Sequence, residues 1–187
     1  MRSLSLHLLQ LILLLTGVVG FTSCSGDSYI NAIPSDVTAI MTVNTPKSFI
    51  DYKGVDLGSD IYLFEDADGN LGACASLNDG DALAKYFDEQ SGKGICEKVQ
   101  EKRGFRFTLL ANGFLAGFSD NALLLMGPLV ESDKAEMINR MAKLLKQDDE
   151  ASVKNSKIFQ VLDSLGGERK MVARVDALPQ QFITPFM

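Results

Sequence analysis

The sequence predicts an α+β domain with a mostly antiparallel sheet of about seven strands and about three helices packed on one face. Two observations lead to this expectation. Short apolar runs are joined by tight turns rich in glycine, asparagine and aspartate, which is typical of antiparallel hairpins. Three longer segments repeat their apolar residues at helical spacing, as amphipathic helices do.

The first strand and the first hairpin lie early in this domain. Residues 37–43 form a β-branched run with partial alternation, which predicts a strand. Residues 44–50 predict a short helical turn, because their proline suits an early helical position. Residues 60–65 and 71–77 flank a turn at 66–70, where Gly and Asn supply positive φ angles. These two segments therefore predict a hairpin.

A helix and a three-stranded meander are predicted next. With Asp79 or Asp81 as N-cap, apolar residues recur at helical spacing until residues 90–92. Alternating apolar residues and the turns at Asn112-Gly113 and Asp120-Asn121 then predict consecutive antiparallel strands. These strands cover residues 105–110, 114–119 and 122–126.

Two helices and a last strand complete the predicted domain. Asp133 and Glu136 form a capping-box-like start, and an apolar stripe follows as far as Leu145. A further helix is expected at residues 157–165, where two glycines end it, and residues 170–176 predict a strand. The apolar tail beyond them either packs back on the sheet or marks a shortened gene product.

The first 23 residues combine a charged start with a long apolar run. Arg2 precedes a stretch from Leu4 to Phe21 that has few polar interruptions. This is the pattern of a secretory signal peptide. A membrane-spanning helix is the alternative, but the run falls just short of the roughly 20 apolar residues that a span needs, and no basic residue flanks its far end.

The segment Phe21-Thr22-Ser23-Cys24 resembles the lipobox of bacterial lipoproteins, with Phe21 where Leu is usual. The resemblance implies that residues 1–23 are removed and that Cys24 becomes the lipidated first residue. An ordinary secretory peptide with an incidental cysteine is the alternative. Several acyl chains anchor firmly, because each buried CH₂ contributes about 0.8 kcal/mol. We expect residues 24–32 to form a tether and residues 33–187 a single domain.

Histidine and tryptophan are both missing from the expected mature chain. The one histidine, His7, lies in the signal peptide, and the sequence contains no tryptophan. These absences argue against Ser-His-Asp and Cys-His catalysis and against most transition-metal sites, and they weaken a carbohydrate-stacking site. The glycines also lack the spacing of a phosphate-binding loop. We therefore expect neither a metal nor another cofactor.

The chain is acidic. Its formal net charge is −6, and loss of Arg2 with the signal peptide makes it −7. Nucleic acid and anionic lipid are bound by Lys and Arg side chains that neutralise phosphates, so we expect no nucleic-acid partner. The expected partners are the membrane, through the lipid on Cys24, and an envelope protein or glycan.

Two further cysteines, Cys74 and Cys96, remain in the expected mature chain. Disulfides form outside the cytoplasm, and a bridge that closes a loop of this length would contribute about 3 kcal/mol in the chain-entropy model. A Cys74–Cys96 disulfide is therefore one hypothesis. Because Cys74 lies in an apolar run, two separately buried thiols are the alternative.

Acidic residues in the predicted turns suggest two other kinds of site. Residues 66–70 superficially resemble a calcium loop, but their glycine comes at position four and a strand follows at once, so turn chemistry explains them better. The pairs Glu65-Asp66 and Asp148-Asp149 would catalyse acid–base chemistry only if burial separated their pKa values. Both pairs fall in predicted turns, and we assign no catalytic residue.

Residues 33–44, which read Ile-Pro-Ser-Asp-Val-Thr-Ala-Ile-Met-Thr-Val-Asn, begin shortly after Cys24. This opening resembles that of a family of uncharacterised Bacteroidetes-type lipoproteins, and residues 156–160 are a looser match. The resemblance covers a small part of the chain. Members of the family are usually much longer, which implies a shortened relative or an N-terminal half. The family has no assigned activity, so it implies no functional residues.

Together these features favour a lipid-anchored protein of the bacterial cell envelope, at the outer membrane, with its periplasmic or surface side left open. The expected role is a non-enzymatic binding or envelope-organising module. The alternative is a carboxylate-dependent envelope enzyme that acts on glycans. A deep cleft with two acids roughly 5 to 10 Å apart would favour the enzyme, and an exposed apolar patch of several hundred Å² would favour the binding module.

Overall fold

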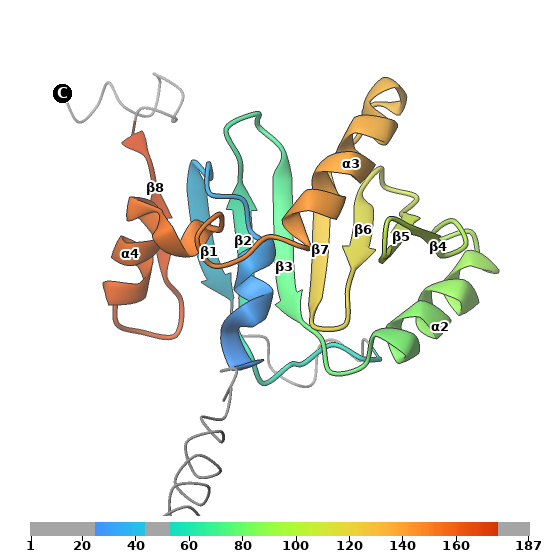
Figure 1. Cartoon of the computed structure of the whole chain (residues 1–187), viewed down its shortest axis with the longest axis horizontal. Coiled ribbons are helices and arrows are strands. Elements are labelled where there is room, and N and C mark those ends of the chain that lie inside the picture. The colour runs from blue at the N-terminus through green and yellow to red at the C-terminus, as the bar shows by residue number, and fades with distance from the viewer. Residues whose placement is uncertain (1–24, 44–52, 176–187) are drawn as a thin grey trace, which may run out of the picture.

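The computed structural model describes residues 25–43 and 53–175. An antiparallel sheet of eight strands runs through this part of the chain, and Figure 1 shows its order from right to left as β4-β5-β6-β7-β3-β2-β1-β8. The strands are β1 (Ala39–Val43), β2 (Ile61–Glu65), β3 (Leu71–Ser76), β4 (Gln100–Lys102), β5 (Phe105–Leu109), β6 (Leu115–Phe118), β7 (Ala122–Gly127) and β8 (Met171–Ala173). The predicted α+β class is confirmed.

The predicted hairpin and meander both form. β2 pairs with β3, and β5, β6 and β7 follow one another as neighbours in the sheet. The sequence did not predict β4, because its residues Gln100, Glu101 and Lys102 are all polar and exposed and show no apolar alternation. The helical turn predicted at residues 44–50 lies outside the described residues.

Three α-helices lie in the described part of the chain, close to their predicted positions. They are α2 (Gly80–Ser91), α3 (Lys134–Leu144) and α4 (Lys157–Ser164), and the 3₁₀ helices are η1 (Ser25–Ala32), η2 (Glu131–Asp133) and η3 (Val153–Asn155). Asp79 caps α2 by accepting from the N–H groups of Asp81 and Ala82. The capping box predicted at Asp133 is wrong, because its side chain makes no capping bond and η2 leads into α3 instead.

The helices cover both faces of the sheet. Figure 1 views the sheet from the side on which η1, α3 and α4 lie, and their buried residues form the main core with that face. Leu83 and Phe87 of α2 pack with Phe118 and Leu123 in a second core on the opposite face. The expectation that all helices share one face is therefore wrong for α2. Its periodicity predicted an apolar stripe but not the sheet face that the stripe meets.

Residues 25–32, expected to belong to a tether, form η1 and belong to the domain. Tyr29, Ile30 and Ala32 are buried in the main core, and the Tyr29 hydroxyl donates to the carbonyl of Asp60 at 2.8 Å. The tether prediction is wrong for these residues, because two bulky apolar side chains in a polar stretch are too few to reveal burial. No helix in the described ranges is long and apolar enough to cross a bilayer.

Candidate functional site

Of the three cysteines predicted to be functional or structural, the structure describes Cys74 and Cys96. Cys24 and the signal peptide lie outside the described residues. Cys74 and Cys96 are both free thiols, so the disulfide hypothesis is wrong and the alternative of two buried thiols holds. Cys74 donates to the Tyr29 carbonyl in the main core at 3.3 Å, and Cys96 donates to the Phe87 carbonyl in the second core at 3.2 Å. The sheet separates them.

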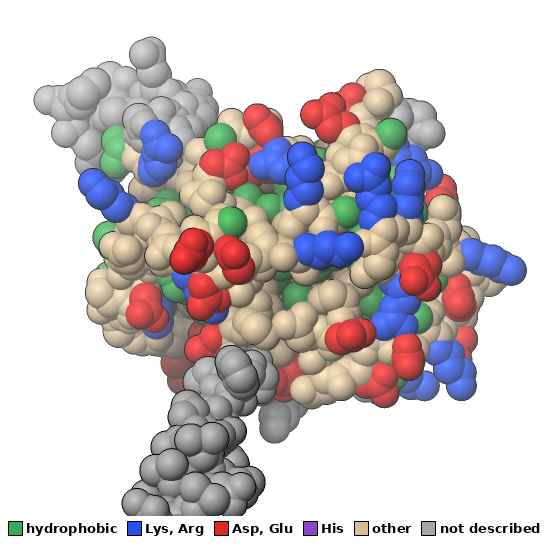
Figure 2. All heavy atoms as spheres, in the orientation of Figure 1, with side chains coloured by type: hydrophobic (Ala, Val, Ile, Leu, Met, Phe, Trp, Pro, Cys, Tyr) green, Lys and Arg blue, Asp and Glu red, His purple; other side chains and the backbone are tan. Residues whose placement is uncertain are grey.

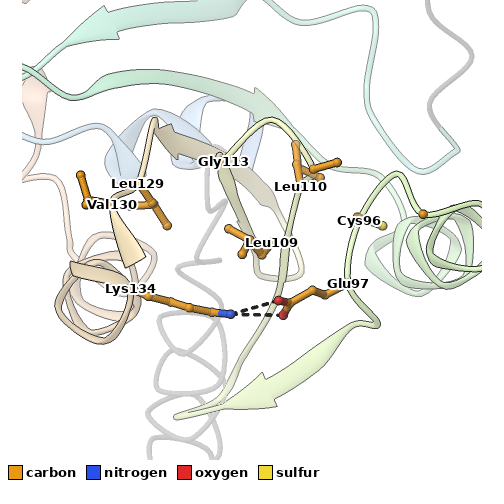
Figure 3. Close-up of a pocket in the computed structure, with 10 residues that line it drawn as sticks. Cys96, Glu97, Leu109, Leu110, Gly113, Leu129, Val130 and Lys134 are labelled. Carbon is orange, nitrogen blue, oxygen red and sulfur yellow. Dashed lines mark hydrogen bonds and ion pairs between the residues drawn. The ribbon is translucent and has the colours of Figure 1, made fainter. Parts of the chain in front are cut away.

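A groove beside the start of α3 is the candidate site, and we call it the Lys134 groove (Figure 3). It encloses about 350 Å³, which falls within the range typical of small-ligand sites. Ten residues line it, namely Gly94, Cys96, Glu97, Leu109, Leu110, Ala111, Gly113, Leu129, Val130 and Lys134. Most of these side chains are aliphatic, and none is aromatic.

Backbone hydrogen bonds hold the walls of the groove together. Glu97 donates to the Leu109 carbonyl at 2.8 Å, and Ala111 donates to the Ile95 carbonyl at 2.9 Å, so the segment before β4 is tied to the end of β5. Gly113 turns the chain with a φ of 83°, a conformation that suits glycine. Its carbonyl accepts from Leu129 at 2.8 Å, which fixes the opposite wall.

One ion pair closes the side of the groove. The Lys134 side chain reaches across from α3, and its Nζ lies 3.1 and 3.3 Å from the two carboxylate oxygens of Glu97 (Figure 3). The Lys134 side chain is 27% exposed and that of Glu97 is 43% exposed. A pair this open to water contributes at most about 1 kcal/mol. A polar ligand group could therefore replace either partner at little cost.

Exposed apolar side chains extend the groove at its rim. Val130 is 65% exposed and lies on one wall, and Ile95 is 51% exposed beside the other wall. The arrangement can hold a compact apolar group between the walls and a charged or polar group at the ion pair. Sequence reasoning missed this site because loops from three parts of the chain build it. Its only signal was a few apolar residues, such as Ile95 and Val130, within polar loops.

A second hollow, of about 300 Å³, lies beside β4 and β5 and is lined by three acids. Asp81, Glu101 and Asp120 line it together with Arg106. Arg106 lies 2.5 Å from Asp81 and 4.0 Å from Asp120, and its guanidinium stacks 5.1 Å from the centre of the Phe118 ring. The side chains of Asp81 and Asp120 are almost fully exposed. Solvent and Arg106 therefore keep them from the dry environment that a general acid needs.

The turn at residues 66–70 is held by its own first residue. The buried carboxylate of Asp66 accepts from the N–H groups of Asp68 at 3.0 Å and Asn70 at 2.9 Å. Arg140 of α3 contacts it as well, at 3.1 Å. Turn chemistry thus accounts for this sequence. Within the described ranges, no group of three or more His, Cys, Asp or Glu residues is placed to hold a metal ion.

Comparison of the chain with protein-family models, with curated proteins and with solved structures found no match.

Proposed function

We propose that this chain is a lipid-anchored protein of the bacterial cell envelope whose domain is a non-enzymatic binding module. The observation that carries the binding role is the Lys134 groove, which combines aliphatic walls, an exposed apolar rim and one ion pair. The signal-peptide pattern and the lipobox-like segment before Cys24 support the anchor at the outer membrane. Residues 33–44, which resemble the opening of the Bacteroidetes-type lipoproteins, support kinship with that family.

The chemistry of the groove favours an envelope protein over a glycan as the partner. Sugar-binding sites commonly stack rings on aromatic side chains, and the ten lining residues include none. An aliphatic side chain of a partner fits between Leu109, Leu129 and Val130. Lys134 and Glu97 then offer one group of each charge to the neighbouring polar atoms of that partner.

The distribution of acids supports binding rather than glycan hydrolysis. Glu97 is the one carboxylate among the lining residues of the groove, and Lys134 neutralises it. The acids of the second hollow are open to solvent and share Arg106. Glycosidases pair two carboxylates, one of which is held in a dry environment as the general acid. The groove has a single carboxylate, and Asp81 and Asp120 of the second hollow are almost fully exposed.

A pull-down from native membranes with the lipidated protein tests the proposal. The wild type should recover a discrete envelope protein, and Val130→Asp should lose it, because a charge on the rim opposes an apolar partner. Val161→Asp is the matched control, since Val161 is also an exposed aliphatic residue but lies on α4. Recovery of no partner, or equal recovery by all three proteins, would contradict a binding role for this groove.

A further inference from the structure

Part of the sheet has an apolar face that no described element covers. On β1, β2, β3 and β8, alternate residues such as Ile40, Cys74 and Val172 point into or pack against the main core. Their neighbours in sequence point to the opposite side. Some of these neighbours, such as Ala75, pack in the second core. We call the apolar ones outside that core the open face, namely Ala39, Met41, Leu63, Leu71, Ala73 and Met171, and Glu65 lies among them.

The strand register makes the open face continuous. Met41 lies opposite both Leu63 and Met171, and Leu63 lies opposite Ala73, so one apolar row crosses four strands. Leu63 is 39% exposed, Leu71 50% and Met171 62%. A shallow hollow of about 180 Å³ lies along these residues, and Glu65 is the one charged residue that lines it. A sheet face that meets water normally carries polar residues at these positions.

The side of the domain that η1, α3 and α4 cover does not share this character. Figure 2 shows the side covered by η1, α3 and α4, where Lys, Arg, Asp and Glu side chains of both signs are interspersed and hydrophobic side chains are sparse. Contiguous apolar patches on soluble domains usually mark contact surfaces. The open face is therefore composed like a face that another segment covers.

The chain itself leads to this face. The N–H of Arg174 donates to the Thr38 carbonyl at 2.8 Å, so the chain still follows the sheet edge one residue after β8. Ala173 lies opposite Ala39, and the register continues from Ala39 through Glu65 to Leu71. The chain thus leaves β8 at the end of the open face where Leu71 is exposed.

We propose that the segment after Val175, residues 176–187, covers the open face. The segment has one charged residue, Asp176, and its apolar residues include Leu178, Phe182, Ile183, Phe186 and Met187. Twelve residues can span about 40 Å when extended. The four strands of the open face are about 14 Å wide, because neighbouring strands lie roughly 4.8 Å apart. The segment is therefore long enough to cross the face from β8 to β3.

Tryptophan fluorescence of the full mature protein tests this proposal, because the natural chain has no tryptophan. Phe182→Trp introduces a single emitter. Its emission should lie at shorter wavelength than in the unfolded protein, and adding Leu63→Asp should shift it to longer wavelength and increase acrylamide quenching. Adding Val161→Asp, on an exposed residue of α4, should leave both signals unchanged. Met171→Asp, on the exposed edge of the face, should repeat the Leu63→Asp shift and guards against misfolding of the first variant.

Two results would overturn the proposal. The first is emission of the Phe182→Trp protein that matches the unfolded chain and does not respond to Leu63→Asp or Met171→Asp. The second is a shielded emission that is lost on dilution together with a dimer in analytical ultracentrifugation, because a second copy would then cover the face. The Lys134 groove lies elsewhere on the domain, so neither result bears on the binding role proposed above.

Discussion

The carboxylate of Asp66 is fully buried and lies 3.1 Å from Nη2 of Arg140, which ties the β2–β3 turn to α3. Arg140 also contacts Asp36 and Asp68, so one guanidinium joins three acids from two segments of the chain. Burial by itself lowers the pKa of Arg140, but its hydrogen bond with Asp68 and the charges of Asp66 and Asp36 raise that pKa overall. Arg140 therefore stays charged wherever the protein is folded.

Removal of Arg140 should leave Asp66 as a buried and uncompensated charge. We expect Arg140→Met to lower the free energy of unfolding by about 3 kcal/mol, the low end of the range for breaking a buried pair, because Asp68 and Asn70 still donate to Asp66. Urea unfolding measures this loss. Combining Arg140→Met with Asp66→Asn should recover part of it. If Arg140→Met and the wild type had the same free energy of unfolding, the ion pair would not be what holds the turn.

Gly72 leaves room for an aromatic ring on the neighbouring strand. Phe64 lies opposite Gly72, and a Cβ added at Gly72 would come 2.1 Å from the Phe64 ring. We expect Gly72→Ala to cost about 1–3 kcal/mol, because the ring must move within a packed core. Gly166→Ala is the control, since nothing lies within 4 Å of the added carbon and φ is not positive there. Equal thermal unfolding of the two variants would contradict this packing.

Stability should decrease at alkaline pH. Burial raises the pKa of the Cys74 thiol, and burial followed by nearby negative charges raises the pKa values of Tyr29 and Tyr62. Above about pH 8.5 for the thiol and about pH 10 for the phenols, the unfolded chain releases protons that the folded chain retains. The free energy of unfolding therefore falls as pH rises, by at most about 1.4 kcal/mol per pH unit for each group.

Replacement of the thiol separates its share of this effect. Cys74→Ala should flatten the first part of the decline, near pH 9, and leave the part due to the tyrosines. Chemical denaturation between about pH 7 and pH 10.5, which covers both usual ranges, gives the profile. A free energy of unfolding of the wild type that rises with pH over this range would contradict the raised pKa values of the thiol and the two phenols.

The anchor proposed at Cys24 has a direct chemical consequence. Cys24→Ser should abolish incorporation of labelled fatty acid and release the protein from the membrane fraction, since a serine offers no thiol for the diacylglycerol. Cys74→Ala keeps Cys24 and should remain acylated and membrane-bound. Acylation of the Cys24→Ser protein, or membrane retention equal to wild type, would count against the anchor.

Local sequence patterns predicted the strands and helices well where burial alternates. The Phe105–Leu109 run and the Asn112-Gly113 turn carry their own structural information, so the meander was predictable. β4 was not, since its residues are polar and its pairing with β5 is a tertiary contact. The burial of Tyr29 in η1 and the placement of α2 on the second face also depend on contacts between distant segments.

The candidate site was less predictable than the fold for the same reason. The Lys134–Glu97 pair joins residues 37 positions apart, and a hydrogen bond from Leu129 to Gly113 brings two loops together at the groove. Cys74 and Cys96 are a contact that the sequence suggested and the structure does not form. The expected extracytoplasmic location and the even number of these cysteines suggested a bridge, but Cys74 belongs to the main core and Cys96 to the second core, on the two sides of one sheet.

Site-specific photo-crosslinking in native envelopes tests the binding role of the Lys134 groove most directly. A photoreactive residue at Val130, on the rim, should give a discrete adduct with an envelope protein, and Leu109→Asp should abolish it. The same residue at Val161 on α4 should give no such adduct. Adducts of the same size from both positions, or none from Val130, would contradict the account.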